Sequence, residues 1–273
     1  MFKNILLPTD GSDYSLTASR YTIELAKLYG ATVHGLSVVN IKLTQGHLIG
    51  DLSSIVRLDP SQLEEVLQDK GLALLNKLRE TCESAGVTYK MSSSMGIIGN
   101  SICQKARIAD LIVMGKYGES GKWAGPLLGS VAETVVRQAD KPVLLVSEEY
   151  QPISKILMAY DSGRSANHTL HFAADLAMNL KVPIVVLAVS DDEEKRRSIL
   201  EEAQCYLEAY KVRVELLSKD GEPSEEILSA AKDNDIDLIA MGAYGHNIRE
   251  FLLGSITEHV MRETPCPILL YRD

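Results

Sequence analysis

Two glycine-containing segments of the sequence have residue types that suit the binding of an anion. One is MGAYGHNIREFLLGS, from Met241 to Ser255, and the other is MGKYGESGKWAGPLLGS, from Met114 to Ser130. Each follows a short apolar run and leads into a run with helical periodicity. Glycines let backbone amides approach a ligand closely, and the start of a helix adds partial positive charge. The same pattern also suits a plain tight turn.

The serines that end both segments have a purely structural alternative. Ser130 with Glu133, and Ser255 with Glu258, spell capping boxes at the starts of the next helices. A capping box accounts for each serine but leaves the upstream glycines of both segments unexplained. We therefore favour nucleotide binding in at least one half of the chain over an empty turn.

A carboxylate follows the first predicted strand of each half. Asp10 stands in PTDGS and Asp161 stands in AYDSG. In an open α/β sheet, ligands bind beyond the carboxyl ends of the strands, where the strand order reverses. If the first and fourth strands are neighbours, the carboxylate and the glycine segment share one crevice. A helix cap or an Asx-turn explains the two aspartates equally well.

Other signatures of phosphate chemistry are incomplete. GESGKW looks like a Walker loop, but Trp123 follows Lys122, and no glycine stands at the required upstream position. His168 and His171 have a spacing that can hold a metal, but no third ligand is nearby in sequence. No catalytic constellation is visible. Lys116 and Lys122 lie where cations could meet phosphates, although loop lysines are usually only solvated.

The elements that position these residues occur twice in the chain. A first segment, beginning NILLPTDGSD, aligns without gaps with KILMAYDSGR, so that Asp10 matches Asp161. ADLIVMGKYG matches IDLIAMGAYG, and LLGSVAETVVRQADKPVLLV matches LLGSITEHVMRETPCPILLY. This pattern indicates duplication of a whole domain. We expect domains at 1–147 and 153–273, with an insertion at about 41–60 in the first.

Short apolar runs alternate with helix-like runs within each half. The strands predicted in the N-terminal half are Ile5–Pro8, Thr32–Val39, Val87–Ser92, Leu111–Met114 and Val143–Val146. Four of the five runs are nearly continuous in apolar residues, as buried parallel strands are, whereas the third run of the C-terminal half alternates and suggests a strand near an edge. The alternation predicts an α/β fold with two tandem, doubly wound, five-stranded parallel-sheet domains.

Composition limits the class of protein. The chain has 273 residues, 45% hydrophobic and 24% charged, which is typical of globular proteins and long enough for two domains. A net charge of −9 argues against a general binder of nucleic acid or anionic membranes. No apolar run approaches the ~18 residues that span a bilayer. The four cysteines lie far apart without a CxxC motif, so we expect reduced thiols and a cytoplasmic location.

In combination, these features resemble the universal stress protein family, in a tandem form that covers essentially the whole chain. The resemblance rests on the aspartate turns, the DLIVMG and DLIAMG strands, the Gly-x-x-Gly segments ending in Gly-Ser, and the closing KPVLLV and CPILLY. The ATP-binding branch of the family has nine residues between the second and third glycines. Here ten residues separate Gly118 from Gly129, and eight separate Gly245 from Gly254.

The resemblance implies that the protein binds ATP or another adenine nucleotide, with or without Mg²⁺. The contacts that it implies in the C-terminal half are Ala159, Asp161, Val189, Met241, Gly242, Gly245, Gly254, Ser255 and Ile256. Those in the N-terminal half are Pro8, Asp10, Val38, Met114, Gly115, Gly118, Gly129, Ser130 and Val131. The longer glycine segment and the insertion of the N-terminal half are features that can occlude its cleft.

The resemblance also implies a nucleotide-dependent regulatory or partner-binding module of the stress response, with an unknown protein partner. It permits slow ATP hydrolysis without requiring it. Two alternatives stay open, a dimeric interaction module with empty clefts and a slow ATP hydrolase. By resemblance, the last strands of the two halves meet antiparallel, so that the domains pack as a pseudo-two-fold pair within one chain. A homodimer of the whole chain is a further expectation.

Overall fold

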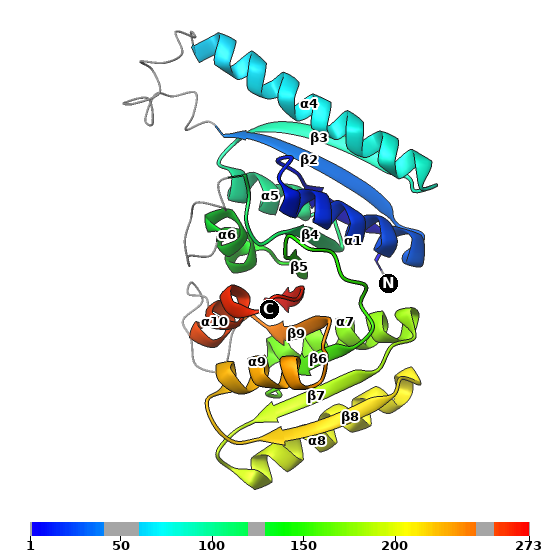
Figure 1. The fold of residues 1–273 in the computed structure, drawn as a ribbon, viewed down its shortest axis with the longest axis vertical. Helices are drawn as coiled ribbons and strands as arrows, with labels where there is room; N and C mark the ends of the chain where they lie inside the picture. The colour runs from blue at the N-terminus through cyan, green and yellow to red at the C-terminus, as the bar shows by residue number, and fades with distance from the viewer. Residues whose placement is uncertain (1, 41–59, 120–128, 244–253, 273) are drawn as a thin grey trace.

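The computed structural model describes residues 2–40, 60–119, 129–243 and 254–272, in which strands and helices alternate along the chain (Figure 1). The N-terminal half contains β1 (Asn4–Pro8), α1 (Asp13–Tyr29), β2 (Thr32–Asn40), α4 (Pro60–Ser84), β3 (Tyr89–Gly96), α5 (Ile98–Ala106), β4 (Leu111–Gly115), α6 (Ser130–Gln138) and β5 (Val143–Val146). The C-terminal half contains β6 (Ile156–Ala159), α7 (Arg164–Leu180), β7 (Ile184–Val189), α8 (Glu193–Leu207), the 3-10 turn η2 (Glu208–Tyr210), β8 (Val214–Lys219), α9 (Pro223–Asp233), β9 (Leu238–Gly242), α10 (Ser255–Glu263) and β10 (Ile268–Tyr271). The insertion predicted at about 41–60 falls almost entirely outside the described residues.

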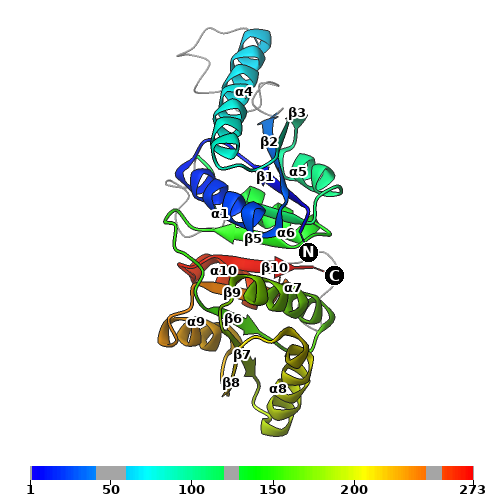
Figure 2. The same ribbon diagram turned by 90° about the vertical axis from the view of Figure 1, so that its right-hand side faces the viewer.

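The ten strands of the described residues form one sheet, in the order β3-β2-β1-β4-β5-β10-β9-β6-β7-β8 (Figure 2). Neighbouring strands within each half are parallel, whereas β5 and β10 pair antiparallel, with Leu144 opposite Leu269. The order of the second half mirrors that of the first. This arrangement confirms the prediction of two tandem doubly wound domains that pack as a pseudo-two-fold pair. β8, the alternating strand, lies at an edge as predicted.

The strand predicted at Val87–Ser92 differs in its bounds. β3 runs from Tyr89 to Gly96 and pairs with β2 along its whole length, as far as Asn40 opposite Gly96. The serine-rich second half of β3 has little preference of its own for a strand. Pairing with β2 therefore extends the strand beyond the point where the apolar pattern ends.

Each face of the sheet is covered by helices from both halves (Figure 2). Buried side chains of α1, α4, α7 and α8 share one core cluster, and those of α5, α6, α9 and α10 share the other. Leu144 and Leu269, at the junction of the halves, both belong to the first cluster. Each core layer is therefore continuous from one half into the other, as one packed body.

The linker between the halves is fastened to α1. The Thr17 hydroxyl donates to the Glu148 carbonyl at 2.5 Å, and the Tyr21 hydroxyl donates to the Gln151 carbonyl at the same distance. The Arg20 guanidinium lies 4.0 Å from the centre of the Tyr150 ring, within the range of a cation–π contact. These contacts hold the linker in place instead of leaving it as a free tether.

Candidate functional site

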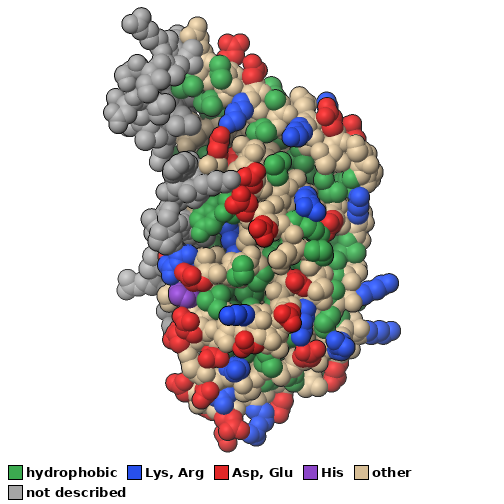
Figure 3. Space-filling model, viewed as in Figure 1, with side chains coloured by type: hydrophobic (Ala, Val, Ile, Leu, Met, Phe, Trp, Pro, Cys, Tyr) green, Lys and Arg blue, Asp and Glu red, His purple; other side chains and the backbone are tan. Residues whose placement is uncertain are grey.

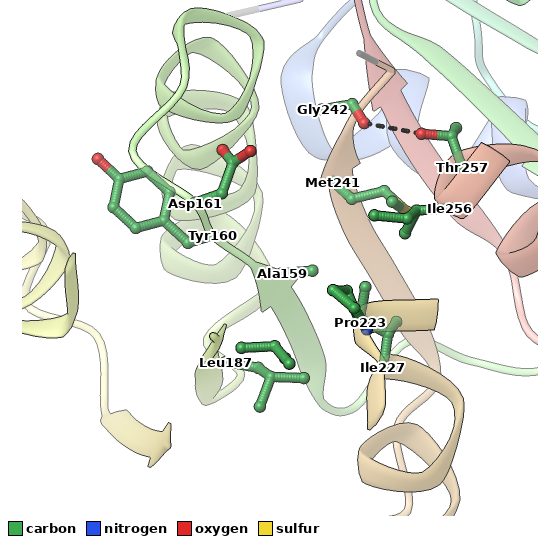
Figure 4. Close-up of a pocket in the computed structure, with 11 residues that line it drawn as sticks. Ala159, Tyr160, Asp161, Leu187, Pro223, Ile227, Met241, Gly242, Ile256 and Thr257 are labelled. Carbon is green, nitrogen blue, oxygen red and sulfur yellow. Dashed lines mark hydrogen bonds between the residues drawn. The ribbon is translucent and has the colours of Figure 1, made fainter. Parts of the chain in front are cut away.

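A pocket of about 160 Å³ opens at the carboxyl ends of β6, β7 and β9 (Figure 4). β6 pairs with β7 on one side and with β9 on the other, so the pocket lies where the strand order reverses. It is lined by Ala159, Tyr160, Asp161, Leu187, Val189, Pro223, Ile227, Met241, Gly242, Ile256 and Thr257. The turn after the first strand of this half therefore meets the end of the fourth, as the sequence predicts.

Six of the nine residues predicted for the C-terminal site line this pocket together: Ala159, Asp161, Val189, Met241, Gly242 and Ile256. Gly254 and Ser255 stand at the start of α10 but are not among the lining residues. Gly245 lies outside the described residues. The structure brings the six together, and their role as ligand contacts stays a prediction.

Sequence reasoning missed five of the lining residues: Tyr160, Leu187, Pro223, Ile227 and Thr257. Tyr160 directly follows the predicted contact Ala159, and Leu187 lies two residues before the predicted contact Val189 on β7. Pro223 and Ile227 belong to α9, which lies outside the aspartate turns and the glycine segments. The sequence does contain a signal for these two residues. Pro223 marks the start of a helix directly after the third strand of this half, and that helix therefore begins at the edge of the sheet where the pocket lies.

The pocket has an apolar end and a polar end. Figure 4 shows Leu187, Pro223 and Ile227 gathered at one end, and Asp161, Gly242 and Thr257 at the other. Leu187 and Ile227 also belong to a core cluster, so the apolar end is backed by packed side chains. An amphipathic molecule with an apolar ring and a polar tail matches this division.

At the polar end, Thr257 ties α10 to the end of β9. Its hydroxyl lies 3.3 Å from the Gly242 carbonyl and 3.2 Å from the Ala243 carbonyl, and donates to them. Thr257 is buried, so these bonds are shielded from water. The position of the start of α10 thus determines the shape of the pocket at this end.

Tyr160 lines the pocket, but its hydroxyl is occupied elsewhere. It donates to the Glu202 carboxylate at 2.6 Å and also contacts the Asn167 side chain. Burial raises the pKa of Tyr160 well above its usual value, and the acceptor Glu202 raises it further. The phenol stays protonated and anchors the β6 turn to α7 and α8.

Both aspartates close Asx-turns, so the structural alternative for them is present in the fold. Asp161 accepts the Gly163 amide at 2.9 Å, and Asp10 accepts the Ser12 amide at 3.0 Å. Asp10 also accepts the Glu119 amide at 2.9 Å, which binds the glycine segment to the first turn. The Asx-turn of Asp10 uses one carboxylate oxygen, and the second oxygen accepts the hydrogen bond from the Glu119 amide.

The capping boxes predicted for Ser130 and Ser255 are wrong. The N-caps of α6 and α10 are Gly129 and Gly254, and neither helix has a side-chain cap. Both serines are the first residue of their helix and are exposed. Because a capping box needs the serine one position earlier, the first-turn amides receive no bond from it.

The predicted residues of the N-terminal half occupy equivalent places. Pro8 ends β1, Val38 lies in β2, Met114 and Gly115 end β4, Asp10 and Gly118 contact each other, and Gly129, Ser130 and Val131 begin α6. α4 lies against this part of the N-terminal half. Lys70 pairs with Glu119 at 3.1 Å, and a Cβ on Gly11 would lie 2.9 Å from a methyl of Leu74.

Packing accounts for four of the glycines without a ligand. A Cβ on Gly115 would lie 2.5 Å from the Tyr14 Cβ, and one on Gly118 would lie 2.6 Å from an Asp10 carboxylate oxygen. A Cβ on Gly129 would lie 2.5 Å from the Lys116 carbonyl, and one on Gly242 would lie 3.0 Å from the Ala166 nitrogen. The close approach is therefore between parts of the protein itself.

We expect Gly129→Ala to destabilise the ligand-free protein by about 2 kcal/mol, because a backbone carbonyl cannot move aside as a flexible side chain can. Urea unfolding followed by circular dichroism measures the change. Ser130→Ala, one residue along and exposed, is the control and should change the free energy of unfolding by less than about 0.5 kcal/mol. Equal stability of Gly129→Ala and wild type would contradict the packing explanation.

Lys116, considered above as a cation for phosphates, has a different role. Its side chain is buried, with 2% of its surface exposed. Its ammonium donates to the Thr264 carbonyl at 2.6 Å and to the Cys266 carbonyl at 3.0 Å, both in the other half of the chain. Burial lowers the pKa of Lys116 to about 8. This lysine joins the two halves instead of facing a ligand.

The buried ammonium predicts a pH dependence of stability. Because the pKa of Lys116 is about 8 in the folded protein and 10.5 when exposed, the unfolded state binds more protons between these values. The cost of burying the charge is complete below pH 8 and is relieved as pH rises through this window. From pH 7.5 to 10.5, wild type should gain about 3 kcal/mol of unfolding free energy relative to Lys116→Met. Urea titrations of both proteins measure the difference, and a constant difference would contradict the prediction.

Comparison with known proteins identifies the family. The chain matches the Universal stress protein family twice, over residues 1–147 and 152–272. The chain belongs to this family. The universal stress protein Slr1230 of Synechocystis sp. is 32% identical over 290 residues, which cover 99% of this chain and all of that protein. The universal stress protein MJ0531 of Methanocaldococcus jannaschii is 37% identical over 155 residues, covering 54% of this chain and 84% of that protein.

A solved universal stress protein shares the fold of the whole chain. The crystal structure of a universal stress protein from Archaeoglobus fulgidus superimposes with a TM-score of 0.80 at 24% identity, covering 98% of this chain and 96% of that one. Among the described residues of our universal stress protein, we find no helix with the length and apolar character that crossing a membrane requires. On the face drawn in Figure 3, the described lysines and arginines are scattered among acidic side chains.

Proposed function

We propose that this universal stress protein binds an adenine nucleotide, ATP in the first instance, in the pocket of its C-terminal half. The observation that carries the proposal is the meeting of the β6 turn, the end of β9 and the start of α10 around one pocket at the switch point of the sheet. Apolar pockets with a few convergent polar groups are the usual form of small-molecule sites.

The base would occupy the apolar end of the pocket, between Leu187, Val189 and Ile227. The described cavity, about 160 Å³, is smaller than the ~300–1,000 Å³ of pockets that enclose a drug-sized ligand. A cavity of this size would hold the base alone, and the sugar and phosphates would extend out of it along the polar end. Asp161 stands there to accept ribose hydroxyls, as a carboxylate does in other nucleotide sites.

The phosphates would lie at the start of α10. Gly254 caps this helix without a side-chain bond, so its first-turn amides are available to an anion and lie at the positive end of the helix. Ser255, the first helical residue, is exposed and adds a hydroxyl. Mg²⁺, the usual companion of nucleotide phosphates, would be held chiefly by the phosphates of the bound nucleotide.

The N-terminal cleft is a second candidate site for nucleotide. Asp10 lies there beside Gly118 and accepts the Glu119 amide, and Gly129 lies beside Lys116. α4 lies against this cleft through Leu74 and Lys70, so we expect weaker binding there. As a universal stress protein, the chain would act in the cytoplasm as a nucleotide-dependent regulator that binds a partner or a second copy, and hydrolyse ATP slowly at most. The free state of its four cysteines supports that compartment.

One observation favours a second function, that of an interaction module with empty clefts. Close packing against other parts of the protein accounts for the presence of four glycines that close approach of a phosphate would otherwise account for. The two functions are separated by measuring nucleotide released from purified protein on denaturation, by mass spectrometry, and then ATP binding to the stripped protein by calorimetry. We expect an adenine nucleotide and a stoichiometry of one or two per chain. No released nucleotide and no binding at millimolar ATP would establish the empty module.

A further inference from the structure

The Lys116 ammonium lies at the C-terminal end of α10. Thr264, which accepts its shorter hydrogen bond, is the C-cap residue of that helix, and Cys266 lies two residues further on. Unpaired carbonyls at a helix C-terminus carry partial negative charge and attract a cation, which offsets part of the cost of burying the ammonium. No carboxylate among the described residues lies within ion-pair distance of this ammonium, and the two carbonyls are its partners.

The opposite end of α10 forms part of the C-terminal pocket. Ile256 and Thr257 line it, and the Thr257 hydroxyl bonds the Gly242 carbonyl at the end of β9 (Figure 4). α10 has nine residues and is about 14 Å long. A helix this short moves as one rigid piece, so holding its far end holds the wall of the pocket.

Lys116 itself belongs to the glycine segment of the N-terminal half. Its carbonyl lies 2.5 Å from the position of a Cβ on Gly129, and its neighbour Tyr117 contacts the Tyr14 ring with centroids 5.4 Å apart. Lys116 and Tyr117 are thus fixed to α1 and to the start of α6. A reciprocal contact exists, because Arg272 of the C-terminal half donates to the Arg137 carbonyl in the last turn of α6.

We propose that Lys116 is a positioning residue for the C-terminal pocket, through which the N-terminal half holds α10 in the orientation that binds nucleotide. This inference rests on the proposed function. It makes the C-terminal site dependent on a side chain from the other domain. That side chain acts at the C-terminal end of α10, and the pocket lies at the N-terminal end of the same helix. Ala243, the equivalent of Lys116 in the second half, has no such side chain.

The electrostatic surroundings of Lys116 determine how the proposal is tested. The Cys266 thiol interacts with the ammonium, and Asp237 and Tyr21 interact with that thiol in turn. Burial raises the pKa of Cys266 and also that of Tyr21, so both stay protonated between pH 7 and 9. Burial lowers the pKa of Lys116 to about 8, inside this window. Phosphate groups ionise near pH ~6, below it.

The test measures the affinity for ATP from pH 7 to 9 in wild type, Lys116→Met and Lys27→Met. In wild type, the dissociation constant should rise about fivefold across this range as the ammonium loses its proton. Lys116→Met should bind about tenfold more weakly at pH 7 and show no such rise. Lys27→Met removes the same charge from an exposed position in the last turn of α1, at the opposite end of that helix from the Asp10 turn, and should behave as wild type.

Amide hydrogen exchange without nucleotide provides the second measurement. Lys116→Met should speed exchange in residues 255–266, with α8, which packs in the other core cluster, as an unaffected reference. Equal ATP affinity and an equal pH profile in Lys116→Met and wild type would overturn the positioning role, as would unchanged exchange of α10. If wild type binds no nucleotide, the proposed function fails, and exchange in residues 255–257 alone decides whether Lys116 holds the pocket wall. Should Lys116→Met not fold, the pH profile of wild type, with Lys27→Met as control, decides.

Discussion

Val189→Trp is expected to weaken ATP binding to the C-terminal pocket by about 100-fold, or about 3 kcal/mol. Val189 ends β7, lines the pocket and is only partly buried, so an indole can enter the cavity without displacing the core. The cavity is about 160 Å³, and an indole would occupy most of the space proposed for the base. Calorimetry with stripped protein measures the loss, and the thermal unfolding temperature confirms that the fold survives.

The matched control is Val38→Trp, which makes the same change at the equivalent position of β2. If the C-terminal pocket is the stronger site, Val38→Trp should leave the tighter binding event unchanged. Unimpaired ATP binding by a folded Val189→Trp protein would place the nucleotide elsewhere. Loss of the tighter event in Val38→Trp alone would transfer the main site to the N-terminal half.

Leu144→Asp is expected to unfold both halves together, with a loss of about 5 kcal/mol or more. Leu144 faces a core cluster that runs through both halves, is 1% exposed and pairs with Leu269 across the junction. An unpaired carboxylate at such a position is among the most destabilising changes known. The core cluster shared by the two halves argues against their separating as two intact domains.

Leu16→Asp is the control, because it makes the same substitution at a leucine of α1 that is 46% exposed. It should change stability by less than about 0.5 kcal/mol. Circular dichroism and small-angle scattering distinguish the outcomes for Leu144→Asp. Retained secondary structure with an extended envelope would mean that the halves separate as folded units, contrary to our expectation.

The pattern of apolar runs was sufficient to predict the sheet, because buried parallel strands leave nearly continuous apolar stretches and the duplication supplies each stretch twice. β5 and β4 illustrate this, since their predicted bounds agree with the structure to within a residue. β3 was predicted less well, because its serine-rich end becomes a strand through pairing with β2. Pairing is a tertiary effect, and local sequence does not encode it.

The candidate site was predicted where its residues lie directly after strands. Asp161 follows β6, and Ala159 and Gly242 are the last residues of β6 and β9, so all three lie where the carboxyl ends of parallel strands meet at one edge. Residues that arrive from a helix, such as Ile227, were missed. The role of Lys116 was also beyond sequence reasoning, since its partners are about 150 positions away along the chain. The predicted capping boxes were wrong because the Ser-x-x-Glu spacing does not determine at which residue a helix begins. Both helices begin at the serine, whereas a capping box requires the serine to precede the first helical residue.

The antiparallel junction of β5 and β10 has a consequence for solubility. It consumes the two most apolar edges, VLLV and ILLY, and leaves β3 and β8 as the ends of the sheet. Those ends are poor templates for another strand, because β3 is rich in serine and β8 carries Glu215 and Lys219. Cutting the chain in its linker would reverse this protection. Each fragment would expose an apolar edge strand that can pair with the same strand of another fragment. In the continuous chain the two edge strands pair with each other, and this pairing protects against aggregation.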